Sequence, residues 1–214
     1  MSTGVPDGPV EERLARRLDR LSPETHPFAH RSAGMLHALG RLDLAAYTAV
    51  ARMSTPLLDV PLRRLSHFAN FSKPWFLTAA GLALLGGPTG RRAAVTGVAA
   101  IGAASLLVNQ PMKLLGDRRR PDRDNHDVPE ARWVPMPTST SFPSGHSASA
   151  AAFAVAVSDV VPALRAPLGA VAGTVAFSRV YVGVHYPGDV LVGAATGALL
   201  GRLVSHLGGR LARH

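Results

Sequence analysis

The sequence predicts an all-α fold, a polytopic membrane helical bundle of five to six spans with an N-terminal amphipathic region. Uncharged windows are the first reason: the 20 residues from Ala93 to Met112 and the 17 residues between Lys73 and Arg91 carry no charge. A bilayer span needs about 20 apolar residues, and about 17 suffice at the lower end. Small residues are the second reason, because glycine lets helices approach closely in lipid, where dry packing holds them together. The glycines concerned are Gly97, Gly102, Gly169, Gly173, Gly193, Gly197 and Gly201.

Composition narrows the classes of chemistry and partner. The 214-residue chain has no cysteine, which excludes disulfide frameworks, thiolate nucleophiles and cysteine-ligated metal centres. Its net charge of +9 would suit a nucleic-acid partner. Its basic residues, however, flank the apolar windows, as they do in the loops of membrane proteins. We therefore expect a bilayer around this chain and no nucleic acid.

The N-terminal third is too polar for an evident first span. Residues 1–33 are predicted to be a polar, partly disordered tail, in which Val10–Leu21 has leucines at helical spacing. Residues 34–72 are helical in pattern but interrupted by charges and prolines. They are predicted to form amphipathic interfacial helices or a first span, and a crossing or re-entrant segment over residues 42–58 is favoured.

Residues 73–207 are predicted to form the membrane core, followed by a basic tail over residues 208–214. One polar insert, Lys113–Pro143, interrupts the apolar pattern. A loop of about thirty residues inside a helical bundle is more often functional than decorative. The expected spans are Pro74–Gly87, Ala93–Met112, Ser147–Leu164, Ala166–Val184 and Val190–Leu207.

Three polar clusters at span ends are expected to meet. The long insert joins the first two clusters without a crossing, and two crossings separate the second from the third, so all three lie on one face. Together they supply three cations, two imidazoles and one carboxylate. These are Lys113, Arg120 and Arg179, then His146 and His185, and Asp189.

This set of side chains suits phosphoryl transfer. Three cations would repel one another in an empty pocket, and a phosphate group would neutralise them. The backbone N–H groups of Gly145 and His146, at the start of a helix, favour an anion as well. One histidine can attack phosphorus while the other protonates the leaving oxygen. Asp189, four residues after His185, can orient that imidazole.

The spacing of these residues resembles a known signature. Lys113-x6-Arg120-Pro121, Pro143-Ser144-Gly145-His146 and Ser178-Arg179-x5-His185-x3-Asp189 look like the three motifs of the type 2 phosphatidic acid phosphatase family. The resemblance covers about residues 40–207. It implies a catalytic membrane phosphatase core over residues 73–207 and a phosphorylated lipid as substrate. The candidates are phosphatidic acid, phosphatidylglycerol phosphate and polyprenyl phosphates or pyrophosphates.

The resemblance also implies a role for each residue. His185 would be the nucleophile that becomes a phosphohistidine, Asp189 its orienting partner and His146 the general acid. No cofactor or metal is expected, because cations neutralise the phosphate charge. Phosphate oxygens would be bound by Lys113, Arg120 and Arg179, with Ser144 and the Gly145 N–H completing the cradle.

Several further expectations remain open at this level. A vanadate-dependent haloperoxidase-like site and a non-catalytic protein that binds anionic lipid are the alternatives. By resemblance to bacterial members the enzyme would be multi-pass in the plasma membrane with its site on the outer face, and the arginines after the other span ends agree with the positive-inside rule. The insert arginines Arg118, Arg119 and Arg123 are interpreted as an ordinary solvated loop, and the histidines outside the motifs as surface residues.

Overall fold

The computed structural model describes residues 27–113 and 118–211, and these are helical with irregular connections and no strand. The predicted all-α class is confirmed for this part of the chain, whereas the expected Val10–Leu21 helix lies outside it. Pro74, Pro88 and Pro187 each stand at the first or second position of a helix, where proline's missing N–H costs nothing. The α-helices are α2 (Pro27–Ala51), α3 (Pro56–Phe68), α4 (Lys73–Leu85), α5 (Gly87–Leu107), α7 (Gly145–Val160), α8 (Arg165–Tyr181) and α9 (Pro187–Leu211).

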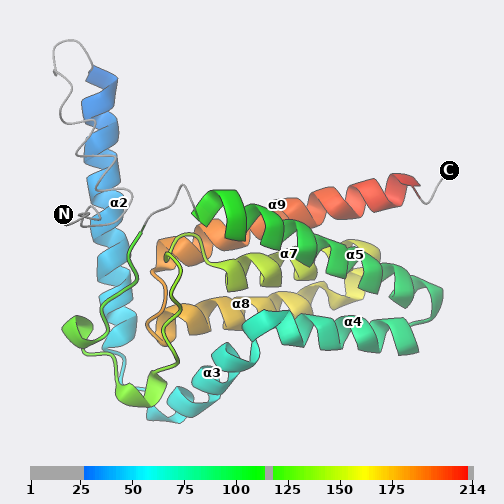
Figure 1. The fold of residues 1–214 in the computed structure, drawn as a ribbon, viewed down its shortest axis with the longest axis horizontal. Helices are drawn as coiled ribbons and strands as arrows, with labels where there is room; N and C mark the ends of the chain where they lie inside the picture. Colours follow the sequence, from blue (N-terminus) through cyan, green and yellow to red (C-terminus); the bar gives the residue numbers. More distant parts are fainter. Residues whose placement is uncertain (1–26, 114–117, 212–214) are drawn as a thin grey trace.

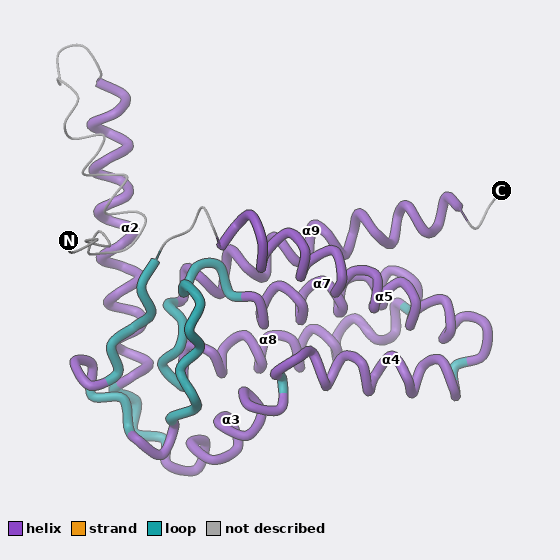
Figure 2. Tube along the Cα trace, in the orientation of Figure 1, coloured by secondary structure: helices purple, strands orange, loops and turns teal. Residues whose placement is uncertain are grey.

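Five of these helices lie side by side in one bundle: α4, α5, α7, α8 and α9 (Figure 1). Helix α2 runs across one end of the bundle, and α3 leads from it into α4. The long connection between α5 and α7 lies at this same end (Figure 2). The end of the bundle next to α2 therefore collects nearly all the irregular backbone.

Each of the five expected spans coincides with one bundle helix, although the boundaries differ by several residues. The largest difference is in α5, which begins at Gly87 and gives way to a π-helical segment, Val108–Met112, with Pro111 inside it. Proline removes a backbone hydrogen bond, so a local change of helix type there is expected. By length and composition, one described helix could cross a bilayer, over Pro187–Arg210.

Residues 42–58, favoured as a crossing or re-entrant segment, form two helical pieces. Helix α2 ends at Ala51 and α3 begins at Pro56, which leaves a break inside this range. The side chain of Arg132, from the long connection, donates hydrogen bonds to the carbonyls of Val50 (3.2 Å), Ala51 (3.1 Å) and Met53. The Val50 carbonyl also accepts from the Met53 N–H at 3.3 Å. A distant arginine therefore stabilises the break, which agrees with the prolines that interrupt the helical pattern of residues 34–72.

Glycine residues on α9 determine how closely this helix packs against α7. A Cβ at Gly193, Gly197 or Gly201 would collide with a backbone carbonyl oxygen of α7, those of Ser144, Ala148 and Ala152. The four-residue spacing repeats on both helices, which is the small-residue packing expected in lipid. Gly97 is also in close contact, with Phe153 2.6 Å from its ideal Cβ position. The prediction was wrong for Gly102, Gly169 and Gly173, which have nothing within 4 Å.

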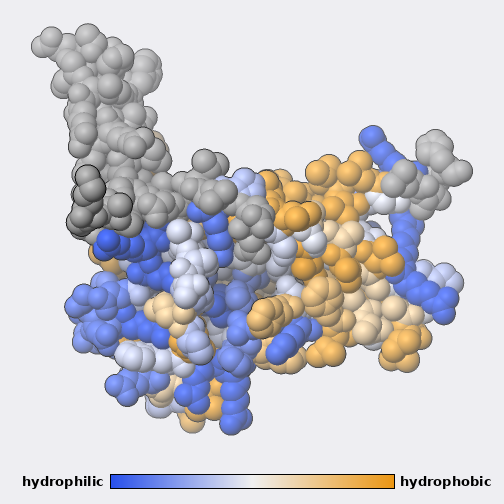
Figure 3. Space-filling view, viewed as in Figure 1, coloured by the Kyte–Doolittle hydropathy of each residue, from blue (hydrophilic) through white to orange (hydrophobic). Residues whose placement is uncertain are grey.

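The surface divides into an apolar and a polar region. In the view of Figure 3 the apolar surface covers the bundle away from α2, whereas polar residues gather at the α2 end. A monomeric soluble protein rarely exposes so continuous an apolar area. The exposed side chains of the bundle include Leu77, Leu84, Leu85, Val95, Leu106, Leu191, Leu199 and Leu203.

Candidate active site

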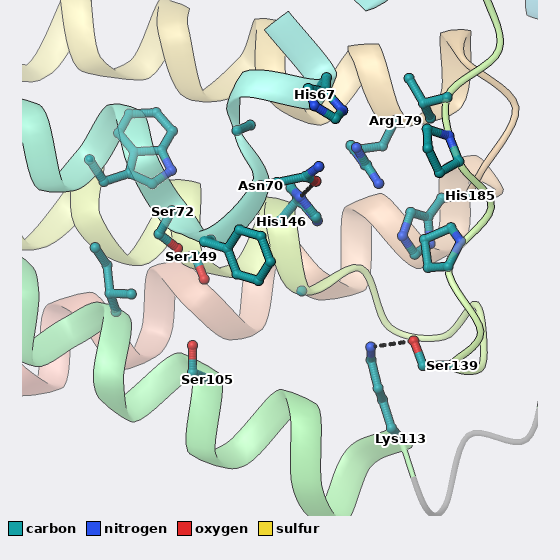
Figure 4. A pocket seen from close by; sticks show the side chains of 18 of the residues that line it. His67, Asn70, Ser72, Ser105, Lys113, Ser139, His146, Ser149, Arg179 and His185 are labelled. Atoms are coloured by element: carbon teal, nitrogen blue, oxygen red, sulfur yellow. Dashed lines mark hydrogen bonds between the residues drawn. The ribbon is translucent and has the colours of Figure 1, made fainter.

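The three sequence clusters line one cavity of about 590 Å³ at the α2 end of the bundle. Lys113, Arg120, Gly145, His146, Arg179 and His185 all face it, as Figure 4 shows for the labelled side chains. Separate helices supply them: Lys113 follows the π-helical end of α5, His146 is in the first turn of α7, and Arg179 is in the last turn of α8.

Asp189 lies behind His185, outside the cavity lining. Its side chain is 0% exposed, and its Oδ2 lies 3.5 Å from His185 Nδ1. The same oxygen accepts a hydrogen bond from Ser141 Oγ and another from the Tyr186 N–H at 2.9 Å. Oδ1 accepts from Arg118 Nη1 at 2.7 Å. The carboxylate is therefore fixed on both oxygens and faces the imidazole nitrogen that points away from the cavity.

The imidazole of His185 is neutral at ordinary pH. Burial is the largest cause and lowers its pKa to about 4; Asp189 raises the pKa, whereas Arg120 and Arg179 lower it further. Nε2 lies 3.3 Å from Arg120 Nη1, on the cavity side of the ring. With the proton on Nδ1, Nε2 accepts a hydrogen bond from Arg120, and its lone pair lies toward the cavity.

His146 has a different partner. Its Nε2 donates to the Asn70 side-chain oxygen at 2.9 Å, and Asn70 belongs to the 3₁₀ turn Asn70–Ser72 between α3 and α4. The two histidines are thus held by separate elements on different sides of the cavity. Such an arrangement leaves room for a reacting group between them.

The three cations are held by neutral oxygen acceptors. Arg120 donates to the carbonyls of Ser139 (2.9 Å) and Val184 (2.8 Å), and Lys113 Nζ donates to Ser139 Oγ at 2.9 Å. Arg179 Nη1 donates to Ser66 Oγ at 2.6 Å. None of the three forms an ion pair with a carboxylate in the described part of the chain. Burial lowers the pKa of Arg120 to about 10, so an anion in the cavity would stabilise its charge.

Ser144 is close to the cavity but turned away from it. Its hydroxyl is fully buried, caps α7 by accepting from the Ser147 N–H at 3.4 Å, and accepts from Ser147 Oγ at 3.0 Å. Ser, Thr, Asp and Asn are the usual residues at this position because they satisfy a free helix N–H. The side chain expected in the cradle therefore supports the helix start, whereas Gly145 lines the cavity.

The expectation that the arginines of the long connection are solvated was wrong for two of them. Arg118 and Arg123 are 1% and 7% exposed. Arg118 is buried because it pairs with Asp43 and Asp189, and Arg123 because it donates to the Val134 carbonyl at 2.8 Å. His67 in α3 is exposed, as expected of a surface residue, and it also borders the cavity.

The sequence reasoning missed the residues that hold the site. Ser139 and Ser141 contact Arg120, Lys113 and Asp189, and they lie directly before the Pro-Ser-Gly-His cluster in a run of hydroxyl residues. Their position beside this motif could have identified Ser139 and Ser141 as site residues. No such feature of the sequence identifies Asn70 and Ser66, because they are 76 and 113 residues away from their partners His146 and Arg179. Within the described residues no group of three or more His, Cys, Asp or Glu could hold a metal ion.

Comparison with known proteins agrees with this geometry. The sequence profile of the PAP2 superfamily matches residues 94–213, which include all three clusters. The chain belongs to the PAP2 superfamily. It is therefore an enzyme of the phosphatase class, like the relatives it matches.

Three relatives illustrate the range of this superfamily. The decaprenylphosphoryl-5-phosphoribose phosphatase of Mycobacterium tuberculosis is 37% identical over 179 residues, 79% of this chain and 92% of the relative. The lipid A 1-phosphatase of Rhizobium johnstonii is 39% identical over 98 residues, 44% of this chain and 39% of the relative. A crystal structure of a PAP2 type phosphatidylglycerolphosphate phosphatase from Bacillus subtilis superposes with a TM-score of 0.63 at 26% identity, covering 81% of this chain and 87% of that one.

Proposed function

We propose that this PAP2 enzyme hydrolyses a lipid phosphate monoester or pyrophosphate through a phosphohistidine on His185. The observation that carries the proposal is the cavity itself, in which the buried Arg179 and the half-buried Lys113 and Arg120 surround a neutral histidine. None of these cations pairs with a carboxylate among the described residues. Such a pocket is complementary to a phosphate that gains negative charge on its oxygens during transfer.

The chemistry proceeds in two displacement steps. The lone pair of His185 Nε2 attacks phosphorus, and the bond from phosphorus to the leaving oxygen breaks as His146 donates a proton to that oxygen. A water molecule then attacks the phosphohistidine, His146 accepts its proton, and the P–N bond breaks to release phosphate and neutral His185. Lys113, Arg120 and Arg179 hold the phosphate oxygens throughout, and Asp189 stabilises the positive charge on the His185 ring.

A direct test replaces the nucleophile. His185→Ala in detergent micelles should abolish phosphate release from phosphatidic acid and from a polyprenyl pyrophosphate, while the circular dichroism spectrum stays that of the wild type. His206→Ala is the matched control, because His206 is exposed on α9 away from the cavity. Full activity of the His185→Ala enzyme would contradict the mechanism.

The membrane arrangement is a second part of the proposal. We infer five to six spans in the plasma membrane, with the cavity on the outer face. Arg91, Arg92, Arg165, Arg202 and Arg210 lie toward the bundle end opposite the site, which agrees with the positive-inside rule.

The absence of cysteine makes this arrangement easy to test. Single replacements Glu130→Cys, on the site side, and Thr89→Cys, in the first turn of α5 at the opposite end of the bundle, both fall on exposed residues. An impermeant maleimide added to whole cells should label only the first. Labelling of Thr89→Cys alone would reverse the orientation.

A further inference from the structure

The cavity has two chemically different ends. Arg179, His185 and the Lys113–Ser139 pair lie at one end, and the hydroxyls of Ser72, Ser105 and Ser149 lie at the other (Figure 4). The Asn70–His146 pair stands between them. In the proposed mechanism the residues at the first end bind the phosphate and attack phosphorus, whereas the three hydroxyls have no role.

Two of these hydroxyls are unusual for helix serines. In an apolar helix a hydroxyl normally donates to the carbonyl four residues earlier, as Thr78, Thr96 and Thr174 do here at 2.8–2.9 Å. Ser105 in α5 and Ser149 in α7 make no side-chain hydrogen bond to any described residue, although Ser149 is only 7% exposed. Neither hydroxyl is among the fully buried polar atoms without a partner in the described residues, so both are open to the cavity and can bond to a group inside it.

The hydroxyl end is on the leaving-group side of the reaction. Ser149 follows His146 by three residues on α7, so it lies one turn deeper on the same helix face. Ser105 precedes Lys113 by eight residues and is likewise deeper in the bundle. His146 delivers the proton to the leaving oxygen, and so the rest of the leaving group must extend past His146 toward these serines.

An apolar groove of about 510 Å³ continues from this point. It runs between α4 and α5 and is lined by alanine and valine side chains with Phe76, which also lines the main cavity. The order along the path is therefore cations, then His146, then hydroxyls, then apolar surface. A substrate that matches this order has a polar, uncharged segment between its phosphate and its hydrocarbon chain.

The backbone at the hydroxyl end is held in an uncommon conformation. Phe71 and Ser72 both have left-handed backbones, with φ of 57° and 58°. Two consecutive non-glycine residues in this region cost free energy and persist where a function requires them. The kink brings Asn70 and Ser72 to the cavity wall ahead of α4.

We propose that Ser72, Ser105 and Ser149 form a subsite for a neutral, hydroxylated leaving alcohol, such as a glycerol or sugar unit that carries the lipid. The inference rests on the phosphatase function proposed above and narrows its substrate class. In Figure 4 the labelled cations Lys113 and Arg179 lie at the other end of the cavity from these serines. A pyrophosphate would place a second anionic phosphate there without a cation to neutralise it. Monoesters of hydroxylated lipids are therefore preferred to lipid pyrophosphates.

Three synthetic substrates of similar chain length separate the possibilities. These are dodecyl phosphate, 1-O-dodecylglycerol 3-phosphate and farnesyl pyrophosphate. We expect the wild-type kcat/KM to be highest for the glycerol ether, whose free hydroxyl can bond to the serines. In Ser105→Ala and Ser149→Ala the ratio of kcat/KM for the glycerol ether over dodecyl phosphate should fall about threefold to tenfold, the effect of one neutral hydrogen bond. Ser158→Ala is the control, since Ser158 is buried on α7 outside the cavity.

The outcomes distinguish this inference from the phosphatase function. If the ratio is the same in the wild type, in Ser105→Ala and in Ser149→Ala, the subsite does not exist, although phosphate release that depends on His185 would leave the phosphatase intact. If the wild type has its highest kcat/KM for farnesyl pyrophosphate, the proposal that the subsite disfavours a second phosphate is wrong. Phosphate release from all three substrates by His185→Ala would instead contradict the phosphatase mechanism itself.

Discussion

Arg118 donates a hydrogen bond from Nη1 to Asp189 Oδ1 at 2.7 Å, and its Nη2 donates to Asp43 Oδ2 at 2.6 Å. This arginine is buried between two carboxylates from α9 and α2, with its guanidinium 4.0 Å from the centre of the Tyr186 ring. Asp43 also accepts from the Gly188 N–H at 2.7 Å. The N-terminal helix α2 is therefore connected through one ion-pair chain to the carboxylate behind His185.

The charge of Arg118 should set the acidity of His185. Arg118→Gln leaves Asp189 less neutralised, so the pKa of His185 should rise by about one unit, and the acid limb of the kcat/KM profile should move up by the same amount. Asp43→Asn removes a negative charge and should move the limb down.

Arg118→Lys keeps the cation and is the control for this pair. Loss of one partner from a buried ion pair costs about 3–5 kcal/mol, so thermal stability must be measured beside each pH profile. If Arg118→Gln and Asp43→Asn lose activity equally and the acid limb of the kcat/KM profile stays at the same pH, Arg118 has only a structural role.

The sequence was sufficient for the helices and for the residues that line the phosphate end. Apolar windows predicted all five bundle helices, and counting the crossings between clusters predicted that Lys113, His146 and His185 would meet. Both inferences depend on periodicity and on order along the chain, which are local properties.

The sequence was insufficient for the buried ion pairs. Arg118 and Arg132 look like other loop arginines, because nothing near them shows that Asp43 and Asp59, 75 and 73 residues away, will bury them. The prolines of residues 34–72 agree with the break between α2 and α3, but the hydrogen bonds by which Arg132 holds that break could not be predicted for the same reason. Long-range pairing of polar groups is determined by the fold, and a pattern of hydrophobic residues does not encode it.

The neutral state of His185 can be observed directly. Because burial lowers its pKa to about 4, the ring is neutral above that pH and gains a proton only as the pH falls through it. In ¹⁵N NMR spectra of the histidine-labelled enzyme, the His185 signals should stay those of a neutral ring down to about pH 5. His185→Ala identifies the signals, and titration near pH 6.5 would contradict this account.

A general acid is needed only for a poor leaving group. His146→Ala should lower kcat/KM for an alkyl phosphate by about 10²–10⁴-fold, the usual contribution of a positioned acid, because kcat/KM covers only the steps up to departure of the leaving group. With 4-nitrophenyl phosphate, whose leaving group departs without a proton, the loss of kcat/KM should be much smaller. Equal losses of kcat/KM for both substrates would show that His146 does not act as the acid for the leaving group.

Ser139 connects two of the phosphate-binding cations. Its hydroxyl lies 2.9 Å from Lys113 Nζ and 3.2 Å from Arg120 Nη2. Ser139→Ala should release Lys113 and remove one bond from Arg120, which keeps its bonds to backbone carbonyls, and it should raise KM about threefold to tenfold, as expected for loss of one to two hydrogen bonds. Thr138→Ala, at an exposed neighbour outside the cavity, should leave KM unchanged. An unchanged KM in Ser139→Ala would mean that the two cations are positioned without this hydroxyl.

Close packing of α7 against α9 should be sensitive to one methyl group. In Gly197→Ala the new Cβ would lie 2.8 Å from Ala148 Cα and even closer to the Ala148 carbonyl, so the two helices must separate. Overpacking of this kind costs about 1–3 kcal/mol. The same helices carry His146 and Asp189, and so activity should fall together with the unfolding temperature in detergent. Gly173→Ala in α8 is the matched control, because nothing lies within 4 Å of the added carbon. If Gly197→Ala unfolds at the same temperature as Gly173→Ala, glycine is not what sets the distance between α7 and α9.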